Sequence, residues 1–190
     1  MQKPNALKRQ KIIDTAARLF ATRPFHEVRL EDVAAAAHVG KGTVYIYFKN
    51  KEELYLSLIR DSFARLIEEL KAEIAHESSP SETLTRMVRR LVAFAFAHPE
   101  YFELLRSARE EQRRSLQSLR RQLTDLFADT LRRGIRQHLW HDPQPQLTAV
   151  CVPGMVRSAV VFGPREMGEE AIAAHIFRLL TFGFCTRESR

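Results

Sequence analysis

The sequence of 190 residues has few of the residues that interrupt helices or cross-link chains: seven glycines, eight prolines and two cysteines. Because little glycine and proline is available for turns, the composition favours long helices joined by few loops. Cys151 and Cys185 stand far apart and outside any CxxC or Cys/His spacing, which indicates neither a zinc site nor a disulfide framework. We therefore expect a reducing compartment and neither a metal nor another cofactor.

The chain also lacks a long hydrophobic run. The longest extends only from Leu91 to Ala97, which is too short to cross a bilayer, and the basic start is not followed by a signal-peptide core. A hydrophobic content of 45% with 28% charged residues is typical of a globular chain rather than a disordered one. These features predict a soluble, cytoplasmic, nearly all-α protein with no membrane partner.

Positive charge is concentrated in the first third of the chain. The formal net charge is +7, and residues 1–60 carry 11 Lys or Arg against 6 Asp or Glu, whereas the rest carry 19 against 17. An excess of basic residues favours a polyanionic partner. The first third is therefore the place to look for a nucleic-acid site.

Apolar residues recur at helical spacing along most of the chain. Helices are expected at 6–21, 30–37, 41–48, 51–74, 83–97, 109–140, 146–162 and 166–183, with a further segment at 101–108. This pattern predicts about nine helices. We interpret residues 1–50 as a three-helix DNA-binding head that contains a helix-turn-helix, and residues 51–190 as a helical body for effector binding and dimerisation.

The third expected helix has an unusually narrow apolar side. At about 100° per residue, Val44 and Phe48 fall together and face a small core, whereas Gly42, Thr43, Ile46 and Tyr47 span the opposite arc. Lys41 and Tyr45 lie at the flank of that arc. A helix that exposes donors and methyl groups over most of its surface suits the major groove of DNA. The alternative is an ordinary helical corner decorated with tyrosines and lysines.

The segment "VAAAAHVGKGTVYIYFKNKEEL", preceded by "KRQKIIDTAARLFATRPFHEVRLEDVA", resembles the TetR family of bacterial transcriptional regulators. The resemblance covers about residues 8–58; beyond it only the helical pattern agrees. It implies a homodimer that binds a palindromic DNA operator. Two heads displaced by about one helical turn, about 34–36 Å, would also suit a short recognition helix on geometric grounds.

The resemblance assigns roles to individual positions of the head. Base-reading positions are Lys41, Gly42, Thr43 and Ile46, and phosphate-contacting positions are Arg29, Tyr45, Tyr47 and Lys51. Arg29 stands where the family usually has a threonine, so a charged contact to phosphate would replace a hydroxyl contact; the alternative is a surface arginine with no role in binding. Two further departures are His38 in place of the turn glycine, where a positive φ is expected, and Gly40 in place of the capping serine, which makes a weaker cap.

An effector site is harder to place. Its candidates are the aromatic, methionine and arginine residues of the body: Phe94, Tyr101, Phe102, Arg106, Phe127, Met155 and Arg157. The alternative is that the aromatic residues form the core and that Arg157 makes an ion pair or lies on the surface. These side chains favour a small apolar or amphipathic effector. His138, His141 and Asp142 could ligate a metal, but no further Cys or His completes a set, so we favour a helix end.

The last two helices are the dimer candidates, with an apolar stripe formed by Ala159, Ile172, Ile176, Leu179, Leu180 and Gly183. No defensible catalytic set occurs, so an enzyme is not expected. The resulting hypothesis is an effector-responsive, homodimeric repressor. Two alternatives remain: a DNA-binding regulator without an effector, and a small-molecule sensor whose helix-turn-helix is vestigial.

Overall fold

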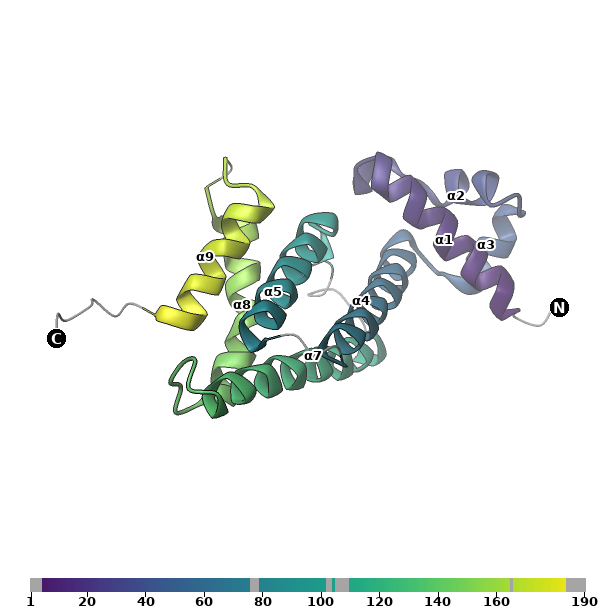
Figure 1. Cartoon of the computed structure of the whole chain (residues 1–190). Coiled ribbons are helices and arrows are strands. Elements are labelled where there is room, and N and C mark those ends of the chain that lie inside the picture. Colours follow the sequence, from purple (N-terminus) through teal and green to yellow (C-terminus); the bar gives the residue numbers. More distant parts are fainter. Residues whose placement is uncertain (1–4, 76–78, 102–103, 105–109, 165, 184–190) are drawn as a thin grey trace. The chain divides into compact units, whose positions relative to one another are not determined.

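The computed structural model describes residues 5–75, 79–101, 104, 110–164 and 166–183, and in these ranges every regular element is helical. The all-α prediction is confirmed. The elements are α1 (Ala6–Thr22), the 3-10 turn η1 (Phe25–Glu27), α2 (Leu30–Ala36), α3 (Lys41–Tyr47), α4 (Lys51–Ala75), α5 (Pro80–Ala97), α7 (Glu110–Arg136), α8 (Pro145–Phe162) and α9 (Glu169–Phe182). Figure 1 shows them in colours that follow the chain.

The described residues belong to two compact units, which are considered separately below. The first is drawn from Met1–Ser62 and Glu100–Ser115, and the second from Phe63–Pro99 and Leu116–Arg190. The division falls within α4, so the first turns of this helix belong to the unit that contains α1, α2 and α3.

The core of the first unit is built from one face of each short helix. Ile12 and Ala16 of α1, Val33 of α2 and Val44 of α3 are fully buried, together with Leu54 from the start of α4. Helices as short as α2 and α3 are marginal in isolation, because helix nucleation is unfavourable. Their stability therefore comes from this shared apolar core.

Local capping sets where several helices begin. The Asn5 side chain accepts hydrogen bonds from the amides of Leu7 and Lys8 at the start of α1. At α5, Ser79 and Glu82 form a capping box, and Pro80 occupies the first turn, where its missing amide proton is not needed. Helix α5 therefore begins three residues before the predicted Thr83, because the cap at Ser79 overrides the apolar pattern.

In the second unit, α5 packs against both α8 and α9 (Figure 1). Buried side chains on α5 include Leu84, Met87 and Val88, and α9 contributes Ile172 and Ile176, which are 4% and 2% exposed. The sequence interpretation had placed these two isoleucines at a dimer interface. The structure places them in the interior of their own unit, because the apolar side of α9 packs against α5.

Candidate nucleic-acid interface

The turn between α2 and α3 contains a left-handed residue, His38, with φ of 53°. The His38 amide donates to the Ala35 carbonyl at 3.1 Å, and the Val39 amide donates to the Ala34 carbonyl at 3.0 Å. This pair of bonds is a Schellman motif, which satisfies carbonyls at the end of a helix and usually has glycine at the left-handed position. The expectation of a positive φ at His38 is confirmed.

Helix α3 begins immediately after this turn, with Gly40 as its N-cap. The Thr43 amide donates to the Gly40 carbonyl at 2.8 Å, and glycine supplies no side-chain cap. At Gly42, a Cβ would meet no other atom within 4 Å. The glycine therefore leaves open space at the exposed start of the helix, through which the backbone can approach a ligand closely.

The two sides of α3 differ as the helical wheel predicted. Val44 is fully buried, and Phe48, the residue that ends the helix, is fully buried beneath the Arg9 guanidinium, 5.2 Å from the ring centroid. On the opposite arc Ile46 is 58% exposed and Thr43 and Tyr47 are half-buried, and Tyr45 at the flank is 44% exposed. Ile46 therefore offers an apolar side chain to a ligand on this side of the helix.

Lys41, the first residue of α3, is held by two contacts within the unit. Its Nζ lies 2.6 Å from Oε1 of Glu31 on α2, and 5.9 Å from the centroid of the Tyr45 ring. The hydrogen bond between Lys41 and Glu31 lowers the pKa of the Glu31 carboxyl and raises the pKa of the Lys41 ammonium. Both groups are therefore charged at neutral pH.

Two predicted phosphate-contacting residues also tie the helices of the unit together. The Tyr47 hydroxyl accepts a hydrogen bond from the Asn5 amide at 2.8 Å, which links α3 to the start of α1. The Lys51 ammonium donates to the Phe25 carbonyl at 2.7 Å and lies 4.3 Å from the centroid of the Phe25 ring. Each group keeps a proton that it can donate to another acceptor, because a hydroxyl has one and an ammonium has three.

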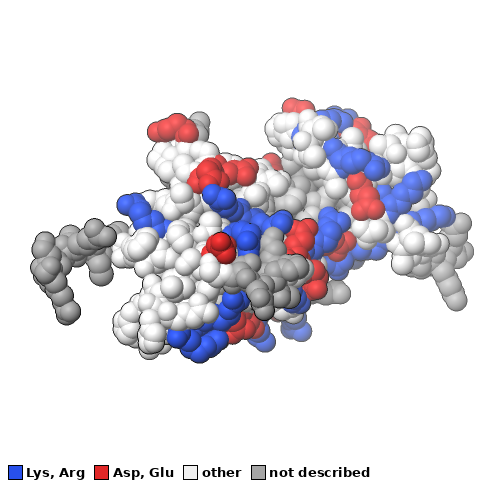
Figure 2. All heavy atoms as spheres, in the orientation of Figure 1, with Lys and Arg blue, Asp and Glu red and all other residues white. Residues whose placement is uncertain are grey.

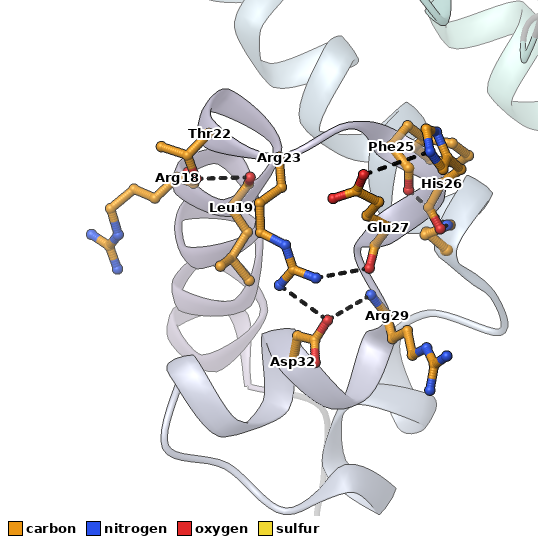
Figure 3. Close-up of polar contacts among 10 residues, drawn as sticks. Arg18, Leu19, Thr22, Arg23, Phe25, His26, Glu27, Arg29 and Asp32 are labelled. Atoms are coloured by element: carbon orange, nitrogen blue, oxygen red, sulfur yellow. Dashed lines mark hydrogen bonds and ion pairs between the residues drawn. The ribbon is translucent and has the colours of Figure 1, made fainter.

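A network centred on Arg23 joins the end of α1 to the start of α2 (Figure 3). Its guanidinium donates to the Asp32 carboxylate at 3.3 Å and to the Glu27 carbonyl at 2.9 Å, while Asp32 accepts from the Arg29 amide at 3.0 Å. The Arg29 amide and the charge of Arg23 help to lower the pKa of Asp32. This network was not predicted from the sequence, although Asp32 at the third position of α2 was a capping signal.

Arg29 is the N-cap residue of α2 and is exposed, as a phosphate-contacting role requires. Figure 2 shows basic and acidic side chains intermixed on one face of the molecule rather than separated into patches of one sign. The basic residues of the first third are spread over its helices, with Lys8, Arg9, Lys11 and Arg18 on α1, so the net charge alone does not locate the site.

The predicted effector residues occupy different environments in the second unit. Phe94 stacks on Phe63 with 5.1 Å between ring centroids and contacts the His98 ring at 4.7 Å. Phe127 is fully buried, and Arg157 is exposed on α8. Burial, with a smaller contribution from Arg65, lowers the pKa of His98 to about 4. Phe94 and His98 thus form a part of the body that is aromatic and only partly enclosed.

Two predicted effector residues, Phe102 and Arg106, lie outside the described residues. A third, Tyr101, is 5% exposed and belongs to the first unit. The other four residues of the predicted set, Phe94, Phe127, Met155 and Arg157, belong to the second unit, where Phe127 is a core residue.

A cavity of about 740 Å³ lies between α8 and α9. It is lined by His141, Asp142, Leu147, Thr148, Cys151, Met155 and residues 179–183. Met155 from the predicted effector set meets Leu179, Leu180 and Gly183 from the predicted dimer set here. Asp142 also accepts a hydrogen bond from the Gln144 amide at 2.8 Å, in keeping with a role in the loop before α8.

Helix α8 exposes much of its apolar surface. By length and composition Pro145–Phe162 could cross a membrane, yet only 17% of it is buried within the chain. Leu147, Val150, Val161 and Phe162 are 46–77% exposed, and Phe182 at the end of α9 is 69% exposed. Exposed apolar surface of this extent on neighbouring helices is typical of an interaction surface or a ligand-binding groove.

Two family profiles match the chain. The profile described as "Bacterial regulatory proteins, tetR family" matches residues 12–58, and "Tetracyclin repressor-like, C-terminal domain" matches residues 77–183, more than half of the chain. The "Fatty acid metabolism regulator protein" of Bacillus subtilis is 31% identical over 83 residues, which are 44% of this chain and 43% of that protein. This alignment thus spans less than half of the relative.

Solved structures share the fold over nearly the whole chain. The transcriptional regulator FadR from Bacillus subtilis, in complex with stearoyl-CoA, has a TM-score of 0.72 and 22% identity over 93% of this chain and 99% of its own. AibR in complex with isovaleryl coenzyme A and operator DNA has a TM-score of 0.64 and 21% identity over 92% of this chain and 98% of its own. At these identities the likeness concerns the fold alone.

Proposed function

Because the chain belongs to the tetR family of bacterial regulatory proteins and is a DNA-binding transcriptional regulator, we propose that it is an effector-responsive, homodimeric repressor of a palindromic operator. The observation that carries the DNA-binding part of the proposal is that α3 has one buried side and one exposed side. Its buried side anchors the helix through Val44 and Phe48, while Lys41, Gly42 and Ile46 are exposed and Thr43 is half-buried.

In this proposal the exposed side of α3 enters the major groove. Lys41 and Thr43 donate to base edges, the Ile46 side chain contacts a thymine methyl, and Arg29, Tyr45, Tyr47 and Lys51 contact phosphates. Selection of duplexes from a random-sequence pool, followed by mobility shifts across salt concentrations, tests it. A selected inverted repeat with a steep salt dependence is expected, whereas a protein with a vestigial helix-turn-helix would select none.

Dimerisation is supported by the exposed apolar residues of α8 and α9. In a symmetric pair, Leu147, Val150 and Val161 would be covered by the same surface of a second copy, as a two-fold interface requires. Leu179, Leu180 and Gly183, which are partly or fully exposed, border the same surface. Ile172 and Ile176 would support this surface from beneath rather than touch the partner.

The effector proposal rests on the relatives and on the body. FadR and AibR were solved with acyl-coenzyme A molecules, which combine an apolar chain with a charged nucleotide. An amphipathic effector of this class suits the aromatic residues around Phe94, with Arg157 as a candidate for the charged part. A thermal-shift series of acyl-coenzyme A molecules tests it, and release of the operator by one that binds separates this proposal from an effector-independent regulator.

The proposed division of labour keeps residues 1–50 as the DNA-binding domain and residues 51–190 as the domain for effector binding and dimerisation. Cytoplasmic location follows from the proposed role, because the operator is there. An effector can release the operator only if it binds one arrangement of the two heads more tightly than the other.

A further inference from the structure

The contact between Glu31 and Lys41 joins the two helices of the helix-turn-helix at the surface proposed to meet DNA. Glu31 lies in the first turn of α2, and Lys41 is the first residue of α3. Their charged atoms are 2.6 Å apart, and the two side chains remain 44% and 62% exposed. The pair therefore lies at the rim of the unit, and a ligand that covers α3 would enclose it.

The Tyr45 ring completes the surroundings of the Lys41 ammonium. Tyr45 follows Lys41 by one turn of α3, which brings its ring near the Lys41 ammonium. The Glu31 carboxylate approaches the same ammonium from α2. A lysine side chain is otherwise among the most flexible, and ordering it opposes binding. Because Lys41 already makes two contacts in the free protein, its side chain has less conformational entropy to lose when DNA binds.

The chemistry of an ammonium makes this arrangement selective. It has three protons, of which the Glu31 carboxylate takes one, so two remain for acceptors on a ligand. A lysine without a partner would reach whichever phosphate is nearest and bind all sequences alike. A lysine held at a fixed place over α3 reaches an acceptor only where a base edge presents one, such as guanine O6 or N7.

We propose that Glu31 is a specificity-determining residue that positions Lys41 for base recognition and holds it away from phosphates. This inference rests on the proposed DNA-binding function. Glu31 itself also places a negative charge at the DNA surface, which weakens binding to every sequence. The positioning of Lys41 and the negative charge of Glu31 together lower affinity for random DNA more than affinity for the operator.

The test compares two duplexes: the one selected from a random-sequence pool, and one of equal length in which that sequence is shuffled. Glu31→Gln is expected to raise affinity for the shuffled duplex at least threefold and to lower the ratio of selected to shuffled affinity at least fivefold. The slope of log affinity against log salt for the shuffled duplex should steepen by up to about 1, because Lys41 then contacts a phosphate.

Two further variants separate positioning from a general effect of charge. Glu27→Gln removes another exposed carboxylate of the same unit and should change both affinities equally, leaving their ratio within twofold. In a Lys41→Met background, Glu31→Gln should also leave the ratio within twofold, because the residue through which Glu31 acts is gone. Circular dichroism melting checks that every variant folds.

The outcomes distinguish the two levels of the proposal. If the ratio is unchanged by Glu31→Gln, or falls equally in the Lys41→Met background, the positioning role of Glu31 is overturned while operator binding stands. If the wild-type chain selects no duplex, the proposed function fails and the role of Glu31 fails with it.

Discussion

Trp140 lies over Gly134 so closely that a Cβ on Gly134 would overlap the indole ring. The indole Nε1 donates to the Leu131 carbonyl at 3.0 Å, and Gly134 is part of the turn that ends α7. The glycine thus lets the loop after α7 fold back, so that Trp140 packs against the last turn of the helix. No rotamer of a longer residue avoids this overlap, because it occurs at Cβ.

Gly134→Ala is expected to destabilise the protein by about 1–3 kcal/mol, because the tryptophan must shift. Gly154→Ala is the matched control: a Cβ there meets nothing within 4 Å, and alanine in a helix is roughly 0.5–1 kcal/mol more favourable than glycine. Urea unfolding midpoints measure both. Equal changes at the two glycines would contradict the packing argument.

His38→Gly is expected to stabilise the protein by roughly 0.5–1 kcal/mol, because glycine adopts positive φ without the steric penalty of a side chain. His138 follows α7 with φ of 57° and the same pair of bonds, from its own amide to Ile135 and from the Leu139 amide to Gly134. His138→Gly should therefore give a similar gain. Thermal melts of both variants measure the effect, and a loss of stability at either position would show that the histidine makes a contact worth more than the strain.

The low pKa of His98 predicts a pH dependence of stability. Burial holds the folded pKa near 4, whereas the unfolded value is about 6.5, so the unfolded chain binds the proton first as the pH falls. Stability is complete above about pH 6.5 and should decline by about 1–2 kcal/mol by pH 5. His98→Gln should flatten this decline, and urea unfolding at pH 7.5 and pH 5 compares the two. An unchanged slope in the variant would assign the decline to other groups.

Tyr45→Phe and Thr43→Val should affect DNA binding in different ways. Removing the Tyr45 hydroxyl should weaken binding to all duplexes alike, because a phosphate carries no sequence information. Replacing the Thr43 hydroxyl with a methyl should change which base is preferred at one position, by about 1–3 kcal/mol. Repeating the selection with each variant measures this. A uniform loss for Thr43→Val would contradict its assignment as a base-reading residue.

Val150→Glu should produce monomers that bind the operator weakly, because a charge would be buried in the proposed contact between α8 helices. Gln117→Glu places the same charge on the exposed surface of α7 and should leave the assembly intact. Light scattering measures the mass of both. If the Val150→Glu protein remains a dimer, the exposed face of α8 is not the dimer interface.

Ile176→Glu tests a different property, since Ile176 is 2% exposed and its replacement should unfold the body.

Much of the fold could be predicted from periodicity and caps, and the helix limits were within a few residues at most positions. The wheel of α3 correctly separated Val44 and Phe48 from the exposed side, because one narrow apolar seam leaves a short helix few ways to pack. The left-handed His38 was also predicted, because the family resemblance places a turn glycine at that position.

What the sequence could not provide was the choice among several apolar faces. Ile172 and Ile176 suited a dimer stripe equally well until the structure showed α5 against them. The same limit applies to Lys51, whose contact with the Phe25 carbonyl joins residues 26 positions apart. Contacts of this kind depend on how η1 folds back, and no short-range pattern records that geometry.

The separation of the two sides of α3 has an evolutionary consequence. Val44 and Phe48 are fully buried and hold the helix in place, whereas Ile46 is 58% exposed and Thr43 is half-buried, so neither belongs to the fully buried core. Substitutions at those surface positions can therefore accumulate in a descendant without unfolding the head. A duplicated copy of this gene could acquire a new operator through a few such changes while inheriting the rest of the scaffold intact.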